Sequence, residues 1–168
     1  MSCAHAPACI NDQIVKTGCY CLNESAVNQY TNLFCGDHTL GVRSDSDEQL
    51  IIHLAFLQTF KLSSVSFGIP GDDTCPATVK LFANVNNLGF SDATDKPATQ
   101  EVQLEPTEGS PNTVTINLQA AKWQRVESLT IFIENNHGAE TTYLHSLKVF
   151  GTPVHGTNVA NISSAGCC

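Results

Sequence analysis

Apolar side chains recur at every second position through most of this chain, and this spacing constrains the fold more than any other feature. Residues 79–85 place Val, Leu, Ala and Val at alternate positions, and residues 114–118 do the same with Val, Ile and Leu. A period of two is that of a strand with one buried face, whereas an amphipathic helix repeats every 3.6 residues. Further strands are expected at 50–56, 62–67, 129–135 and 144–151.

Turn-forming residues separate these predicted strands. Clusters rich in Gly, Pro, Asn and Asp occur at 70–76, 92–97, 105–112 and 134–140. Short strands with turns between them, and no long amphipathic helix, predict an all-β fold, an antiparallel β-sandwich or jelly roll.

The length and composition predict one globular domain. The chain has 168 residues, of which 42% are hydrophobic and 14% are charged, so it is long enough to bury a core and too apolar to be disordered. We expect a flexible, Cys-containing N-terminal segment at 1–12, the β-sandwich domain at 13–151 and a C-terminal tail at 152–168. A chain that closes its own core needs no partner to fold, and a monomer is expected.

The net charge of −8 argues against two classes of partner. A negative field repels nucleic-acid phosphates and anionic lipid headgroups. No apolar run approaches the roughly 20 residues of a membrane helix, and residues 1–16 lack the features of a secretion signal. The expected location is the cytoplasm, the nucleus or both.

The eight cysteines raise the question of disulfides or metal. Most lie near the two ends, so a disulfide framework would leave the strand-rich middle without cross-links, and reduced thiols are favoured. Cys3, His5 and Cys9 offer three soft ligands, one fewer than a structural zinc site uses, and are only a weak metal candidate. The roles of Cys167 and Cys168 stay open, and a thiol- or metal-responsive protein that uses its Cys-rich ends is one functional hypothesis.

Catalytic motifs are missing from the sequence. It contains no G-x-S-x-G, no glycine-rich phosphate loop, no H-E-x-x-H and no C-x-x-C. We therefore expect neither enzymatic activity nor a bound cofactor.

Six segments, in order along the chain, carry a pattern that is more specific than any single motif. They are CLNES at 21–25, SDSDEQLIIHLAF at 44–56, FKLSSVSF at 60–67, TVKLFANVNNLGFSDA at 78–93, VESLTIFIENNHGAETT at 126–142 and LKVFGTPV at 147–154. Together they closely resemble the PITH domain, the proteasome-interacting domain found at the C-terminus of some thioredoxin-like proteins and as a free-standing protein.

This resemblance implies a β-sandwich of jelly-roll type, akin to galactose-binding domains. It also implies a non-enzymatic module that docks on the 26S proteasome as an adaptor or regulator. Thioredoxin-linked members carry W-C-G-P-C ahead of the PITH segment, and this sequence has no such motif. It therefore resembles a free-standing member, and no disulfide-reductase activity is carried over.

Turn placement and the resemblance together nominate three exposed elements as partner-binding surface. The nominated residues are Asp45, Asp47 and Glu48, then Asn136, His137 and Glu140, and finally Gly151, Thr152, Pro153 and Val154.

Other interpretations of these residues stay open. The three carboxylates at 45–48 could close an Asx-type turn where the chain enters a strand, contact a partner, or begin a cation site. The second functional hypothesis is a small-ligand, carbohydrate-like binding sandwich. That hypothesis needs aromatic platforms in loops, and the available rings are Tyr20, Tyr30, Trp123 and Tyr143.

Overall fold

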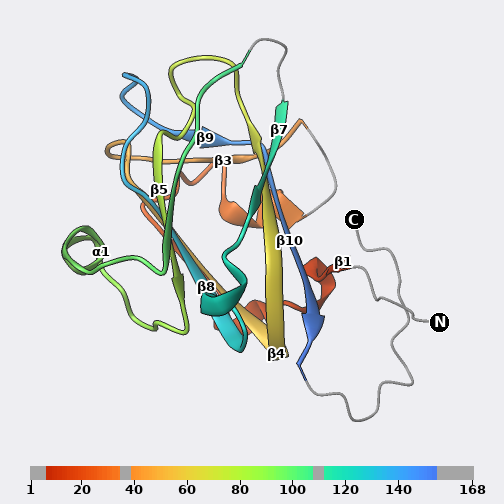
Figure 1. Ribbon diagram of the computed structural model, residues 1–168. Helices are drawn as coiled ribbons and strands as arrows, with labels where there is room; N and C mark the ends of the chain where they lie inside the picture. Colours follow the sequence, from red (N-terminus) through yellow and green to blue (C-terminus); the bar gives the residue numbers. More distant parts are fainter. Residues whose placement is uncertain (1–6, 35–38, 108–111, 155–168) are drawn as a thin grey trace.

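The computed structural model describes residues 7–34, 39–107 and 112–154, which form a curled antiparallel β-sandwich (Figure 1). Its strands are β1 (Ala8–Cys9), β2 (Tyr20–Leu22), β3 (Val42–Arg43), β4 (Leu50–Ile69), β5 (Thr78–Ala83), β6 (Gln100–Gln103), β7 (Asn112–Asn117), β8 (Val126–Ile133), β9 (Tyr143–Leu144) and β10 (Ser146–Pro153). Its helices are α1 (Phe90–Asp95) and the 3-10 turns η1 (Asn11–Gln13), η2 (Lys16–Gly18), η3 (Tyr30–Phe34) and η4 (Ala120–Lys122).

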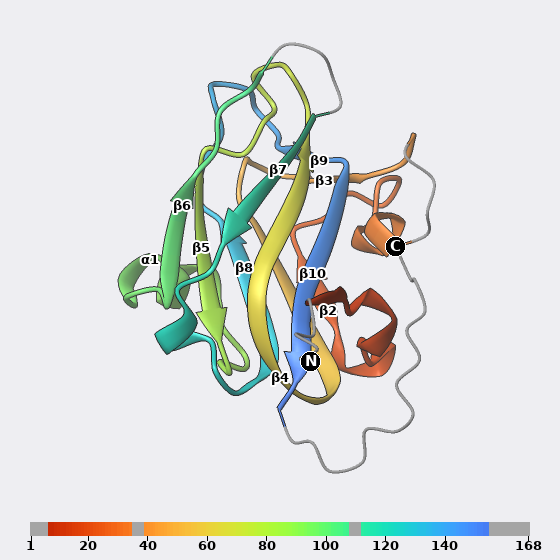
Figure 2. The same cartoon turned by 45° about the vertical axis from the view of Figure 1, so that its right-hand side comes forward.

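The long strand β4 belongs to both layers of the sandwich. Its first half pairs with β2 and β8, and its second half pairs with β10 and β7. One layer therefore reads β2-β4-β8-β5-β6 and the other β1-β10-β4-β7, with the bend of β4 at the lower end of Figure 2. The strands expected separately at 50–56 and 62–67 are thus one bent strand.

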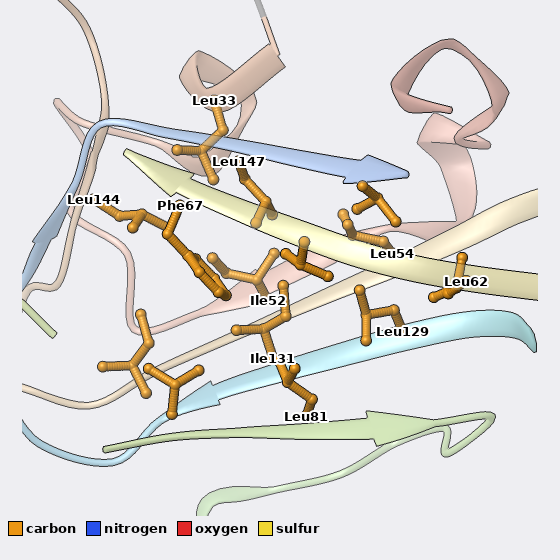
Figure 3. Packing of buried hydrophobic residues seen from close by; sticks show 14 of the residues in the cluster. Leu33, Ile52, Leu54, Leu62, Phe67, Leu81, Leu129, Ile131, Leu144 and Leu147 are labelled. Atoms are coloured by element: carbon orange, nitrogen blue, oxygen red, sulfur yellow. The ribbon is translucent and has the colours of Figure 1, made fainter. Parts of the chain in front are cut away.

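The buried side chains lie between these layers. Leu and Ile residues from β4, β8 and β5 interdigitate with Phe67 and Leu147 (Figure 3). Trp123 is fully buried, and its Nε1 donates to Gln100 Oε1 over 3.1 Å, which satisfies the indole N–H inside the core. The single tryptophan is therefore a core residue and not an exposed recognition ring.

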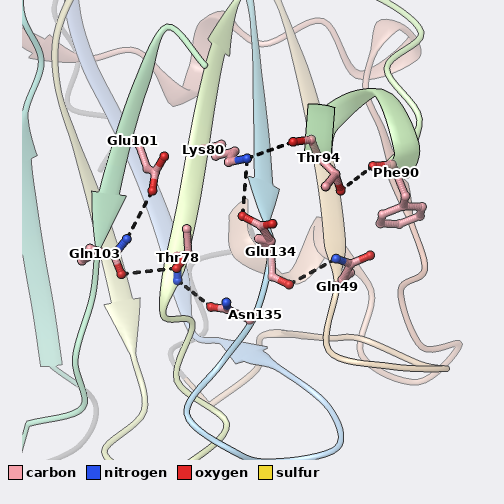
Figure 4. A network of polar contacts seen from close by, with 9 residues as sticks. All are labelled: Gln49, Thr78, Lys80, Phe90, Thr94, Glu101, Gln103, Glu134 and Asn135. Carbon is pink, nitrogen blue, oxygen red and sulfur yellow. Dashed lines mark hydrogen bonds and ion pairs between the residues drawn. The ribbon is translucent and has the colours of Figure 1, made fainter. Parts of the chain in front are cut away.

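A second apolar cluster covers the outer face of β4, β5 and β8. Ile51, Phe82 and Phe132 pack there beneath Leu88 and Ala93, the latter from α1. At its edge, Lys80 Nζ lies 3.4 Å from Glu134 Oε1 and donates to Thr94 O in α1 (Figure 4). The segment around α1, which the sequence suggested only as a turn, is thus the cover of this face.

The ordered domain begins earlier than the expected boundary at residue 13. Strand β1 pairs with β10, Ile10 N donates to Val149 O, and the Ile10 side chain is buried in the core. At the other end, β10 continues to Pro153. Residues 8–12 and 152–153 therefore belong to the sandwich, while 1–6 and 155–168 lie outside the described residues.

His53 is a buried histidine on the covered face. Thr130 Oγ1 donates its one hydrogen to Val85 O, so it accepts from His53 Nδ1, 2.8 Å away. The Tyr20 ring stacks on the imidazole with centroids 4.8 Å apart. Burial lowers the pKa of His53, because removing the imidazolium from water disfavours the charged form.

We expect this histidine to make the fold acid-sensitive. The unfolded chain takes up a proton at His53 near pH 6.5, whereas the folded chain does so only at lower pH, so stability is complete above that range and falls as pH decreases through it. Burial lowers the pKa of His145 as well and acts in the same direction. Urea unfolding at several pH values should show a smaller acid loss in His53→Gln than in wild type, with His137→Gln as the exposed-histidine control. Equal profiles for His53→Gln and wild type would contradict the assignment.

Candidate interaction surface

The acidic segment at 45–48 forms a turn, held by side-chain hydrogen bonds, just before the start of β4. Asp47 Oδ1 accepts from the backbone N of Gln49 and from Asn23 Nδ2, both at 3.0 Å. Asn23, in the left-handed region at φ 72°, also accepts from Ser46 N. The turn interpretation of this segment is confirmed. Asp45 and Asp47 nevertheless remain exposed, so the turn presents carboxylates to solvent.

A second turn is built around the side chain of Asn136. Its Oδ1 accepts from Gly138 N and Ala139 N, and its Nδ2 donates to Thr141 O and Thr142 Oγ1. His137 is exposed and bonds through Nε2 to Leu104 O at 2.8 Å, and Glu140 is exposed beside it. Asn136 therefore shapes this loop, while His137 and Glu140 are displayed on it.

Buried hydroxyls join the two turns into one surface. Thr142 N donates to Ser44 Oγ at 2.8 Å, Ser44 N donates to Thr142 O at 2.9 Å, and Thr142 Oγ1 donates to Glu48 O at 2.7 Å. Ser44 and Thr142 are both buried. We call the exposed residues Asp45, Asp47, His137 and Glu140 the acidic rim.

We expect Thr142→Val to weaken this junction without creating a cavity. The substitution removes two part-buried bonds, the one to Glu48 O and the one from Asn136 Nδ2. Each is worth about 0.5–1.5 kcal/mol, so the free energy of unfolding should fall by about 1–3 kcal/mol. Thr141→Val, one residue away and less buried, is the comparison. Chemical denaturation measures both, and an unchanged Thr142→Val midpoint would show that the hydroxyl does not join the turns.

Residues that the sequence did not single out complete this end of the sandwich. The guanidinium of Arg43 lies 4.8 Å from the Tyr143 ring centroid, and its Nη1 donates to Thr141 Oγ1. The Thr74 hydroxyl and backbone N bond to Asp72 and lower the pKa of that carboxyl, with a smaller contribution from Arg43. Only the strand pairing of Arg43 with Tyr143 brings these groups together, so no local sequence signal marks them.

The third nominated element lies at the opposite end of the sandwich. Gly151 and Pro153 pair with Leu62 and Phe60 near the bend of β4, and Val154 N donates to Thr59 O. Gly151 is buried, and a Cβ on it would lie 2.5 Å from Lys61 O, so close backbone packing requires glycine. Residues 151–154 are therefore not part of the acidic rim.

The metal candidate finds no support among the described residues. Cys9 is disulfide-bonded, so its sulfur is not the thiolate a metal needs, and reduced thiols were the wrong expectation at this position. Cys3, His5, Cys167 and Cys168 lie outside the described ranges. Within those ranges no group of three or more His, Cys, Asp or Glu side chains is arranged to hold a metal ion.

The free thiols in the described ranges are Cys19, Cys21 and Cys75. Burial raises the pKa of all three, to about 11 for Cys75, where Asp72 and Glu105 add to the effect. A raised pKa leaves little reactive thiolate at neutral pH. Cys19 and Cys21 are both partly buried and pack against the core.

Three of the four candidate aromatic rings are engaged within the fold. Trp123 is fully buried, Tyr20 stacks on His53, and the guanidinium of Arg43 lies over the Tyr143 ring.

No helix in residues 7–34, 39–107 and 112–154 has the length and apolar character to cross a membrane.

Comparison with protein families identifies the class. The PITH domain family model matches residues 5–166, so the chain belongs to the PITH domain family. It is similar to Thioredoxin-like protein 1 of Schizosaccharomyces pombe, with 37% identity over 80% of this chain and 48% of that protein. It is also similar to PITH domain-containing protein CG6153 of Drosophila melanogaster, with 28% identity over 86% of this chain and 71% of that protein. The chain thus spans about half the length of the fission yeast relative.

Solved structures confirm the fold class. The family 32 carbohydrate-binding module of Clostridium perfringens NanJ, determined in complex with galactose, superposes with a TM-score of 0.66. The alignment covers 86% of this chain and 98% of that module at 11% sequence identity. This similarity shows a shared galactose-binding-like architecture and, at that identity, nothing about the ligand.

Proposed function

We propose that this chain is a non-enzymatic adaptor or regulator that docks on the 26S proteasome through the acidic rim. Membership in the PITH family, matched over residues 5–166, is the observation that carries the proposal. The expected cellular location, cytoplasm or nucleus, is part of the same proposal.

The construction of the rim supports docking at this end. Buried hydroxyl bonds and the Asn23 and Asn136 side chains fix two loops that lie far apart in sequence, so their exposed carboxylates keep a defined spacing. A preorganised surface loses less conformational entropy on binding than mobile loops do. The carboxylates favour a partner surface rich in Lys and Arg, and attraction of this kind weakens as salt is added.

Affinity purification from a eukaryotic lysate tests the proposal. The tagged chain and a version truncated after Val154 are compared at near-physiological salt, and 26S subunits are scored by mass spectrometry. Recovery by both versions would support docking on the sandwich, and recovery by the full chain alone would place the contact in residues 155–168. Absence from both, with folded protein shown by circular dichroism, would reject the proteasome as partner.

A further inference from the structure

The two layers of the sandwich are unequal on one side of β4. Beyond β4, one layer continues with β8, β5 and β6, whereas the other continues only with β7. Gln100 of β6 donates through Nε2 to Asn117 O of β7, so both edge strands lie on the same side of the sandwich. In Figure 2, β6 and β5 extend farther outward than β7. The position beside β7 and opposite β6 is not taken by a described strand.

The backbone of β7 offers hydrogen bonds at this position. Leu118 N donates to Ser63 O of β4. In an antiparallel pair of strands, successive residues direct their backbone N–H and C=O alternately toward the partner strand and away from it. Val114 and Ile116 therefore bond to β4, and Thr113, Thr115 and Asn117 direct their backbone groups away from it. The Gln100 bond to Asn117 O independently shows that this carbonyl faces outward. The edge therefore presents unpaired backbone groups at Thr113 and Thr115.

The usual protections of a sheet edge are missing from β7. Its six residues, NTVTIN, contain no charge and no proline, whereas β1 and β2 at the other side are edges of only two and three residues. Val114 and Ile116 are only partly buried although they pack on the core, and so is Val102 of β6. A strand added here would cover all three.

We propose that β7 is a strand-addition site for a single extended segment of another protein. The segment would place apolar side chains at alternate positions against Val102, Val114 and Ile116. The intervening side chains of the segment would face solvent on the same side as the exposed Thr113 and Thr115, so polar residues fit those positions. A second copy adding its own β7 is disfavoured, because the overhanging β5 and β6 of the two copies would occupy the same space.

Selection from a displayed random octapeptide library tests the proposal. Enriched peptides should alternate apolar residues with polar residues, and the synthetic peptides should protect the Thr113 and Thr115 amides from hydrogen exchange. Thr115→Pro removes an outward N–H and leaves the bonds of Val114 and Ile116 to β4 in place, so it should weaken binding at least about tenfold. Thr115→Val keeps that N–H and should bind as wild type does.

A second test needs no protein variant. Methylating every second backbone nitrogen of the peptide removes the N–H groups that would bond to β7, so it should abolish binding. A library that yields no binder, or peptides that bind Thr115→Pro as tightly as wild type, would overturn the proposal. So would protection that appears away from β7. A peptide-free dimer that Thr115→Pro dissociates would assign the edge to a second copy and overturn the proposed occupant.

Discussion

Replacing Trp123 with alanine should lower the free energy of unfolding by about 3–5 kcal/mol, a large part of the 5–15 kcal/mol typical of a domain. The indole is fully buried and its N–H bonds to Gln100 Oε1. Its removal leaves a cavity between the layers and releases Gln100, whose other bonds reach Gln119 N and Asn117 O. Chemical denaturation at neutral pH measures the loss.

Two further variants separate the cavity from the hydrogen bond. Trp123→Phe keeps most of the apolar volume and loses the N–H, so a smaller loss is expected than for alanine. Lys122→Ala, an exposed neighbour in η4, should stay within about 0.5 kcal/mol of wild type. A loss below about 1 kcal/mol for Trp123→Ala would show that the tryptophan does not hold the layers together.

Reversing charge on the acidic rim should weaken recovery of 26S proteasome at least about tenfold, equivalent to 1.4 kcal/mol of binding free energy. The informative variant combines Asp45→Lys with Glu140→Lys, because no side-chain hydrogen bond ties either carboxylate into the fold in the described structure. Asp47 is a poor choice, since it accepts bonds from Gln49 and Asn23 and its loss would disturb the turn.

A matched control changes net charge equally but elsewhere. Glu127→Lys and Asp95→Lys alter exposed carboxylates on β8 and α1, away from the rim. This control should co-purify proteasome as wild type does, and the difference between the two double variants should shrink as salt is raised. Equal recovery by both variants would remove the rim from the docking surface.

The strands could be predicted because alternation is a local signal, and the elements that were missed lack such a signal. The run from Leu50 to Ile69 continues through Leu57, Gln58 and Thr59 without a turn residue, so its bend depends on pairing with both layers and not on composition. Strand β6 has four residues and one aliphatic side chain, too few to show a period. Helix α1 has six residues and gains its place by covering Phe82 and Phe132.

The surface could be predicted only in parts. Asp45, Asp47 and Glu48 stand out as a turn, and Asn136 and His137 stand out as another, but their junction through Ser44 and Thr142 spans 98 residues. No local pattern encodes such a contact. For the same reason the sequence did not show that antiparallel pairing carries the third nominated element, residues 151–154, to the other end of the sandwich.

Binding of the purified chain to purified 26S proteasome, measured by interferometry at physiological salt, tests the central proposal most directly. The account predicts saturable binding by the wild-type chain, retained by the Glu127→Lys and Asp95→Lys control and strongly reduced by the Asp45→Lys and Glu140→Lys variant. No binding by folded wild-type chain would contradict a direct contact with the proteasome.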